Sequence, residues 1–319
     1  MLFEKQIINE YKKTTHVRCD DTETVFYFSA DDFDGLFKES YSFKSSLGHT
    51  LQGYIYNYEN PIANRLIVFD HGFGGGHRAY MKEIEMLCRR GYRVFSYDHT
   101  GCMESGGEST RGMAQSLCDL NDCINTIKAD KRFDGLDISV MGHSWGGFST
   151  LNVLALHPEI SHIVVLSGFV SVEEIVNSFF SGATKPYRKA VMRLEREINP
   201  EFTKYHAVES LKNSSVKALL IYSDNDPLVK RNHYDILKDG LSEKENISFM
   251  LVSNKGHNPN YTEDAVKLLG KFSSERTELL KNKKATKEDK EKFVASFDWN
   301  AMTVQDEAVW NAIFEHLNS

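Results

Sequence analysis

The sequence contains no long apolar run. Across 319 residues, no segment approaches the roughly 18 consecutive apolar residues that a membrane-spanning helix requires. The N-terminal stretch MLFEKQIINE also lacks the apolar core of a signal peptide. We therefore expect no membrane span and a cytoplasmic location.

The sequence also has little cysteine and no excess of positive charge. A net charge of -7, without a basic cluster, argues against nucleic acid as a partner, because neutralising phosphates needs a basic surface. Five cysteines without zinc-site spacing predict buried free thiols. With no dinucleotide-type glycine fingerprint and no metal-ligand pattern, neither a cofactor nor a metal is expected. The sequence leaves open whether the chain forms a homo-oligomer.

What the chain does contain is enough apolar sequence for one large core, since 41% of its residues are hydrophobic. Alternating stretches at 38–46 and 50–58 flank a turn and predict an antiparallel hairpin. Short apolar runs then alternate with helical stretches, which is typical of an α/β fold with a mostly parallel, doubly wound sheet. The runs expected to be strands are Leu66–Asp70, Tyr92–Tyr97, Ile138–Gly142, His162–Ser167, Lys217–Ser223 and Ile247–Val252.

The alternation is interrupted between residues 168 and 215. Ser171 and Glu174 form a capping-box signature, and a second helix is expected to begin near Pro186. The insertion is either a lid over the site or a helical segment packed on the sheet without a gating role. The first helix is predicted to place its apolar side chains on one face: Val172, Ile175, Val176, Phe179 and Phe180.

These boundaries predict an N-terminal extension over residues 1–37, a core over 38–167 and 216–319, and a small helical lid insertion over 168–215. Within the core, the charge-rich residues 275–292 predict a solvated helix. A final amphipathic helix is expected from Thr303.

The most informative motif is Gly-His-Ser-Trp-Gly at residues 142–146. It follows a short apolar run and precedes a helical stretch, so it predicts a tight turn between a strand and a helix. Glycines two residues to either side of Ser144 suit such a turn, because a Cβ there would collide with the neighbouring strand and helix. The turn exposes the hydroxyl beside a helix N-terminus, where negative charge is favoured. Ser144 is therefore the candidate nucleophile.

A serine nucleophile needs a base, and the base works best when a carboxylate orients it. Asp224 and Asp226 follow one predicted strand, and His257 follows the next. All three should lie with Ser144 at the carboxyl edge of the parallel sheet. The positions alone do not choose between the two aspartates.

These features resemble the α/β-hydrolase superfamily, in particular its serine esterase and lipase branch, including esterases of cinnamoyl type. The resemblance covers residues 38–317 and implies an α/β-hydrolase sheet with a lid inserted after the sixth strand. The motifs that carry it are the serine turn, His71-Gly72-Phe73-Gly74-Gly75, Asp98-His99-Thr100-Gly101, Ser105-Gly106-Gly107, Asp226-Pro227-Leu228-Val229 and Gly256-His257.

The resemblance assigns the acid to Asp226, which is followed by two residues and a valine. It also assigns the oxyanion hole to the backbone N–H groups of Phe73 and Trp145. Their positions agree with this, because one lies in a glycine-rich turn after a strand and the other begins the helix after the nucleophile. Cys102 departs from the family pattern, which puts the shape of its loop in doubt.

The remaining candidates are interpreted as structural. His71 and His143 are expected to be hydrogen-bonding residues, and Asp98 is expected to anchor a loop. The leading functional hypothesis is a cofactor-independent serine hydrolase that cleaves carboxylic esters of short to medium or aryl acyl groups. A peptidase, thioesterase or acyltransferase with the same nucleophile is the alternative. A third hypothesis is a catalytically silent relative that binds a ligand.

Overall fold

The computed structural model describes residues 3–62 and 64–319, so Met1 and Leu2 of the expected N-terminal extension lie outside it. Its centre is an eight-stranded sheet in the order β1-β2-β4-β3-β5-β6-β7-β8. The strands are β1 (Phe37–Lys44), β2 (Thr50–Asn57), β3 (Arg65–Asp70), β4 (Arg93–Tyr97), β5 (Asp137–His143), β6 (His162–Leu166), β7 (Lys217–Ser223) and β8 (Ile247–Val252).

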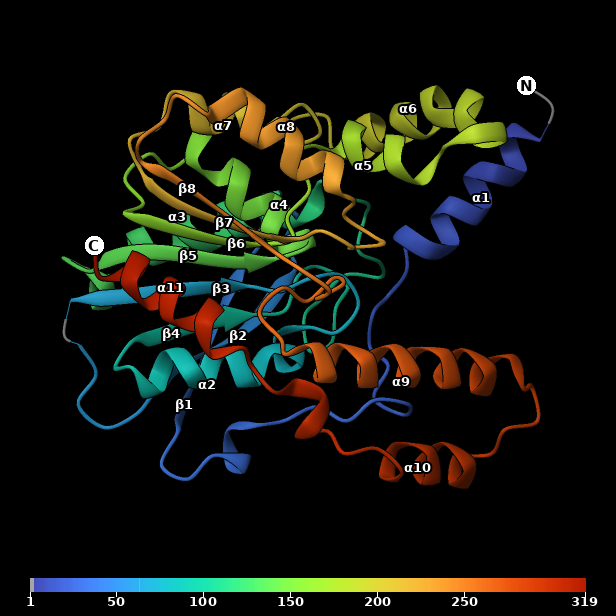
Figure 1. Cartoon of the computed structure of the whole chain (residues 1–319), viewed down its shortest axis with the longest axis horizontal. Helices are drawn as coiled ribbons and strands as arrows, with labels where there is room; N and C mark the ends of the chain where they lie inside the picture. Colours follow the sequence, from blue (N-terminus) through green and yellow to red (C-terminus); the bar gives the residue numbers. More distant parts are fainter. Residues whose placement is uncertain (1–2, 63) are drawn as a thin grey trace.

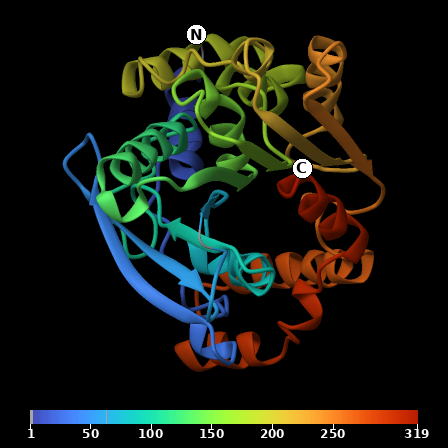
Figure 2. The same cartoon turned by 90° about the vertical axis from the view of Figure 1, so that its left-hand side faces the viewer.

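The sheet begins antiparallel and continues parallel. β1 and β2 form the predicted hairpin, β2 pairs antiparallel with β4, and β3 to β8 are parallel. The two edges are visible in Figure 2, with β1 in blue and β8 in orange. The predicted α/β-hydrolase type of fold is therefore confirmed.

Helices cover both faces of the sheet. One face packs on α3, α4, α7 and α8, and the other on α2 and α11 (Figure 1). The helices are α1 (Glu4–Thr15), α2 (Met81–Arg89), α3 (Gln115–Ala129), α4 (Trp145–Asn152), α5 (Val172–Phe179), α6 (Arg188–Ile198), α7 (Ala207–Lys212), α8 (Arg231–Leu241), α9 (Glu263–Lys281), α10 (Lys287–Ala295) and α11 (Glu307–Leu317). Short 3₁₀ helices are η1 (Ala30–Asp32), η2 (His77–Tyr80), η3 (Lys131–Phe133), η4 (Val153–Ala155), η5 (Gly182–Tyr187) and η6 (Ala301–Thr303). Among the described residues, none of these helices combines the length and apolarity needed to cross a bilayer.

Three helix boundaries differ from the sequence-based expectation. The charge-rich run forms two helices, because Thr286 and Asp289 make a capping box that starts α10 after α9 has ended. The final helix begins at Glu307, since Asp306 caps its first turn, and Thr303 ends a 3₁₀ helix instead. Pro186 lies within η5, and α6 begins two residues later.

The inserted segment packs on the core and against the N-terminal helix. Val172 and Val176 of α5 are buried in the main core cluster, while Phe179 is 46% exposed. α1, α5 and α6 gather at the end of the molecule towards which the parallel strands point (Figure 1).

Glu195 joins these elements. Its carboxylate on α6 is fully buried, accepts the hydroxyl of Tyr11 at 2.7 Å and accepts the backbone N–H of Met113 at 2.9 Å. Burial raises the pKa of Glu195 from 4.5 to about 7. The contact between α1, α6 and the loop before α3 therefore contains a group that titrates near neutrality.

This titration predicts a pH-dependent stability. Between pH 4.5 and about 7, Glu195 is protonated in the folded protein and ionised in the unfolded chain. Unfolding therefore releases a proton, so the free energy of unfolding falls as pH rises from about 4.5 to about 7. The loss is up to about 3 kcal/mol, since each pKa unit is worth about 1.4 kcal/mol. Glu195→Gln should remove this step, because the amide can still pair with Tyr11 and Met113 but does not ionise.

The measurement is urea unfolding at pH 5 and pH 8. The drop in stability should be smaller in Glu195→Gln than in the wild type, and unchanged in Glu197→Gln, an exposed site on the same helix. Equal drops in all three proteins would contradict the assignment.

Candidate active site

Ser144 lies at a strained turn between β5 and α4. Its backbone angles are φ 56° and ψ -108°, which few residues other than glycine adopt. A Cβ on Gly142 would lie 2.2 Å from Oγ1 of Thr150, and a Cβ on Gly146 would lie 2.0 Å from the carbonyl oxygen of Asp70. The prediction that both positions require glycine is therefore confirmed.

The structure places His257 and Asp226 in one hydrogen-bonded chain with Ser144. His257, in the loop after β8, has Nε2 2.8 Å from Ser144 Oγ and Nδ1 2.7 Å from Asp226 Oδ2. Because a carboxylate only accepts hydrogen bonds, it keeps the ring proton on Nδ1 and leaves Nε2 to accept the serine proton. The other oxygen of Asp226 accepts the backbone N–H groups of Leu228 and Val229 at 2.8 and 3.0 Å.

Asp224 lies outside this chain. It is exposed and accepts the backbone N–H of Asn254 at 3.1 Å, a contact that lowers its pKa. Asp226, in contrast, is only 6% exposed. Of the two aspartates after β7, the structure therefore brings only Asp226 to His257.

Phe73 and Trp145 line the same cavity as the serine, one in the turn after β3 and the other at the start of α4. Phe73 follows β3, and Trp145 is the first residue of α4, whose first-turn N–H groups have no acceptor within the helix. Their rings meet edge to face, with centroids 5.2 Å apart. The indole N–H of Trp145 donates to the carbonyl of Met113 at 2.8 Å, which fixes the ring in place.

Tyr80 and His143 connect the turn that holds Phe73 with His257. The N–H of Gly72 donates to the Tyr80 hydroxyl at 3.1 Å, and that hydroxyl lies 2.7 Å from Nδ1 of His143. Nε2 of His143 lies 2.8 Å from the carbonyl oxygen of His257, so this nitrogen carries the proton and Nδ1 accepts from Tyr80. Burial lowers the pKa of His143 to about 3, so the ring is neutral. The sequence predicted a hydrogen-bonding role for His143 but contained no signal for Tyr80.

His71 and Asp98 hold loops in place, as predicted. Nε2 of His71 accepts the backbone N–H of His99 at 2.9 Å, and burial lowers the pKa of His71 to about 3. Asp98 Oδ1 accepts the backbone N–H of His77 at 2.8 Å and lies 2.7 Å from its Nδ1. Neither His71 nor Asp98 lines the cavity at Ser144.

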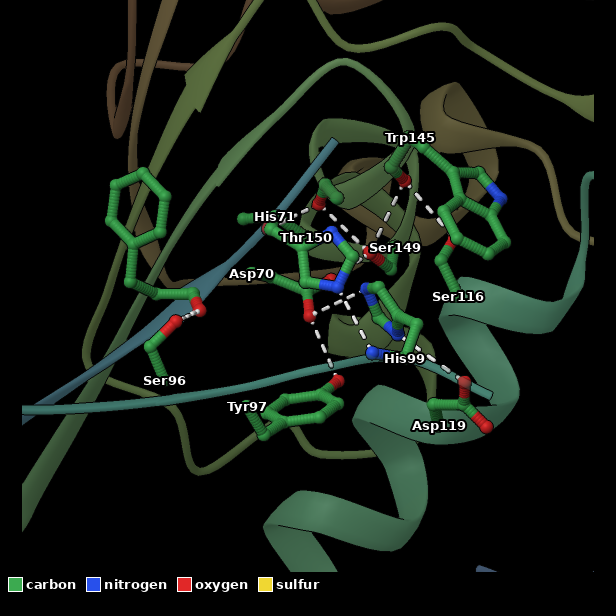
Figure 3. Close-up of polar contacts among 12 residues, drawn as sticks. Asp70, His71, Ser96, Tyr97, His99, Ser116, Asp119, Trp145, Ser149 and Thr150 are labelled. Carbon is green, nitrogen blue, oxygen red and sulfur yellow. Dashed lines mark hydrogen bonds and ion pairs between the residues drawn. The ribbon is translucent and has the colours of Figure 1, made fainter. Parts of the chain in front are cut away.

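A buried ionic cluster of His99, Asp70 and Asp119 lies beside the ring of Trp145 (Figure 3). Nε2 of His99 is 3.1 Å from Asp70 Oδ1, and its Nδ1 is 3.3 Å from Asp119 Oδ2. Burial alone would lower the pKa of His99, but the two carboxylates outweigh it and raise this pKa to about 9. Asp70 also accepts the hydroxyls of Tyr97 and Ser149. His99 is therefore a buried imidazolium that packs 4.8 Å from the Trp145 ring.

A cavity of about 500 Å³ opens beside Ser144. Most of its lining residues are apolar or aromatic, and its lining contains no Asp, Glu, Lys or Arg among the residues that the structure describes. The lining residues are Tyr11, Thr14, Thr15, Gly72, Phe73, Tyr80, Met113, His143, Ser144, Trp145, Phe169, Ile175, Phe179, Phe180, Leu228, Val229 and His257.

The N-terminal segment forms one wall of this cavity. Tyr11, Thr14 and Thr15 of α1 line it, and the Tyr11 ring lies 6.0 Å from that of Phe180. The resemblance begins after α1, so the sequence does not predict this role. No motif marks these side chains, because they reach the cavity only through tertiary packing.

Among the part of the chain that the structure describes, one group of potential metal ligands occurs. Ligand atoms of Cys118, Asp119 and Asp122 lie within 4.8 Å of one another. Asp119 is already paired with His99, and Asp122 accepts the backbone N–H of Ser46. Burial raises the pKa of Cys118 to about 12, which keeps it a thiol, so these residues do not favour a metal site.

Comparisons with known proteins agree on the fold. The chain resembles an esterase of Pyrococcus furiosus with a TM-score of 0.60 and 18% identity, over 83% of this chain and 97% of that one. An acylaminoacyl peptidase of Pyrococcus horikoshii matches with a TM-score of 0.52 and 19% identity, over 70% of this chain and 38% of that one. At these identities the similarity establishes the fold alone.

Curated relatives match over shorter segments. RutD of Rhizobium rhizogenes, named as a candidate carbamate hydrolase, is 28% identical over 114 residues, which are 35% of this chain and 40% of that protein. The acylamino-acid-releasing enzyme of Sus scrofa is 25% identical over 35% of this chain and 16% of its own length. The chain thus matches well under half of the length of either relative.

The family model described as serine aminopeptidase, S33, matches residues 61–232, which is more than half of the chain and includes Ser144 and Asp226. The chain therefore belongs to this family of α/β-hydrolase serine hydrolases.

Proposed function

We propose that the chain hydrolyses carboxylic esters whose acyl group is uncharged and of short to medium length, or aryl. The observation that carries the proposal is the hydrogen-bonded chain from Ser144 through His257 to Asp226 beside an apolar cavity. A concave apolar site with a few convergent polar groups suits a small neutral ligand. No cofactor or metal is part of this mechanism.

In the proposed reaction, Ser144 Oγ attacks the ester carbonyl while Nε2 of His257 takes the hydroxyl proton. Asp226 stabilises the imidazolium that forms. The backbone N–H groups of Phe73 and Trp145 donate to the oxyanion of the tetrahedral intermediate. Collapse of the intermediate releases the alcohol, which takes the proton from His257, and leaves an acyl-enzyme. Water activated by the same nitrogen then frees the acid and restores the serine.

The cavity lining argues for an ester substrate over a peptide with a free N-terminus. An aminopeptidase must bind the α-ammonium group of its substrate, and a charge taken out of water needs a partner of opposite sign. Among the residues that the structure describes, those that line the cavity include no carboxylate. A substrate with a neutral acyl group needs no charged partner, so the cavity suits it. This argument holds even though the family description names aminopeptidases.

A matched substrate set tests this directly. We would compare p-nitrophenyl butyrate with two p-nitroanilides, alanine and N-acetyl-alanine, which share a scissile bond and differ in the charge on nitrogen. The ester should be hydrolysed fastest, and the acetylated anilide faster than the free one. A preference for the free alanine derivative would establish an aminopeptidase, and a protein that no fluorophosphonate probe labels would favour a ligand-binding role.

The two aspartates after β7 provide a matched pair for the mechanism. Asp226→Asn should lower kcat by about 10⁴-fold, because an amide facing Nδ1 of His257 favours the wrong ring tautomer. Asp224→Asn should stay within about twofold of the wild type, since that side chain is exposed and accepts from the backbone of Asn254 rather than from His257. Steady-state kinetics on both variants, with Ser144→Ala as the inactive reference, decide the assignment. Greater sensitivity at Asp224 would show that it is wrong.

The volume of the cavity, about 500 Å³, predicts a limit on acyl length. Each buried methylene contributes about 0.8 kcal/mol, or about fourfold in kcat/KM, until the cavity is full. Activity should therefore rise from p-nitrophenyl acetate to butyrate and fall sharply at palmitate. Phe179 and Phe180 lie on the wall formed by the insertion, so changing both to alanine should shift the optimum to longer chains.

The control is Phe37→Ala, which removes an exposed ring on β1 outside the cavity. It should leave the chain-length profile unchanged. A profile unaltered in the Phe179/Phe180 double variant would show that the insertion does not limit the acyl group.

A further inference from the structure

Two cysteines from distant parts of the sequence face each other across a β-bridge. Cys19, in the segment after α1, and Cys102, in the loop after β4, are directly opposite residues of a parallel β-bridge. The bridge is closed by hydrogen bonds from Cys19 N to the carbonyl of Gly101 and from Met103 N to the carbonyl of Cys19, both 2.8 Å. Cys102 is the residue that departs from the family pattern.

The geometry of the bridge suits a disulfide. Paired strands lie about 4.8 Å apart, which is within the 4.4–6.8 Å Cα separation of disulfides. Directly opposite residues also point their side chains to the same side of the pair. Both cysteines are free thiols, with Cys19 8% exposed and Cys102 fully buried.

The two thiols differ in character. A hydrogen bond from the Cys102 thiol is the largest influence on Cys19 and lowers its pKa, and the Arg18 guanidinium adds to this. The same contact, with burial, raises the pKa of Cys102. Cys19 is also the more exposed of the two, so it is the thiol that an oxidant reaches first, and Cys102 is the resolving one. Asp20 and Met103, which follow the two cysteines in the sequence, line a small cavity of about 200 Å³.

The other three cysteines lack this arrangement. Burial raises the pKa of Cys88, Cys118 and Cys123, which keeps each of them a protonated thiol. Cys118 and Cys123 are five residues apart on α3, so they point to different sides of the helix.

We propose that Cys19 and Cys102 are a reversible oxidation site that closes to a disulfide with a peroxide as oxidant. The Cys19 sulfur attacks one peroxide oxygen and breaks the O–O bond, which gives a sulfenic acid and one water. The Cys102 sulfur then displaces the hydroxyl group as a second water. Overall, two thiols lose two hydrogens and hydrogen peroxide is reduced to two waters; a dithiol reverses the step.

The disulfide ties the N-terminal segment to the core. That segment carries α1, and with it the Tyr11 wall of the cavity. Cys19 also contacts the backbone of Gly74, in the turn that holds Phe73. A cross-link over so long a loop restricts the unfolded chain, so oxidation should raise the melting temperature by about 5 °C.

The test treats the reduced wild-type protein with one equivalent of hydrogen peroxide. Trypsin should then release fragments 19–38 and 94–111, each with a single cysteine, as one cross-linked species by mass spectrometry without reductant. The thiols titrated under denaturing conditions should fall by two from five, and the melting temperature should rise. Dithiothreitol should reverse all three changes.

Variants provide the controls. Cys19→Ser and Cys102→Ser should each abolish the cross-link and the change in melting temperature, while Cys88→Ser, another buried site, should keep both. Five free thiols after treatment, or a sulfinic acid on Cys19 beside a free Cys102, would overturn the proposal. The outcome does not depend on the substrate, because no step uses Ser144.

Discussion

The close contact between α4 and the end of β3 is the constraint on which the site depends. Gly146 approaches the carbonyl of Asp70 so closely that no side chain fits between them. That contact holds Ser144 in a backbone conformation that costs on the order of 1–3 kcal/mol, and it persists only because the surrounding packing leaves no alternative. The turn with Phe73 leaves β3 at this same point. One contact therefore sets the serine relative to the turn that faces it.

The buried ionic cluster shares Asp70 with that contact, since the carbonyl of Asp70 faces Gly146 and its carboxylate pairs with His99. Three ionisable groups out of water cost several kcal/mol each, so His99 with its two carboxylates should add little net stability. The contribution of the cluster is to hold neighbouring elements in position. Asp70 belongs to the end of β3, Asp119 to α3, and His99 packs on Trp145, so the cluster connects β3, α3, the loop after β4 and the start of α4. Removing one charge would leave the others unpaired, which makes the arrangement hard to vary one residue at a time.

A structural feature of this protein can be predicted from the sequence where a short run of neighbouring residues encodes it. Strands, the glycine turn at Ser144 and the placement of His257 at the sheet edge follow from short runs of residues and from the topology of parallel sheets. The break between α9 and α10 was also encoded locally, by the capping box at Thr286, but the dense charge of the run obscured it. Tyr80 and Glu195 could not be found in this way. Their roles arise from contacts with residues far away in the chain, and neither belongs to a motif.

The family match covers most of the residues proposed for catalysis, but it does not cover all of the residues that line the cavity. The family match begins at residue 61 and includes Ser144, Asp226 and both proposed oxyanion donors. Tyr11, Thr14 and Thr15 come before it, yet they line the cavity beside Ser144. The segment that carries them is held to the core by Glu195 and by the bridge at Cys19, neither of which takes part in the proposed reaction. Substrate preference can therefore change through the N-terminal segment while the serine turn, which tolerates no change at its glycines, stays as it is.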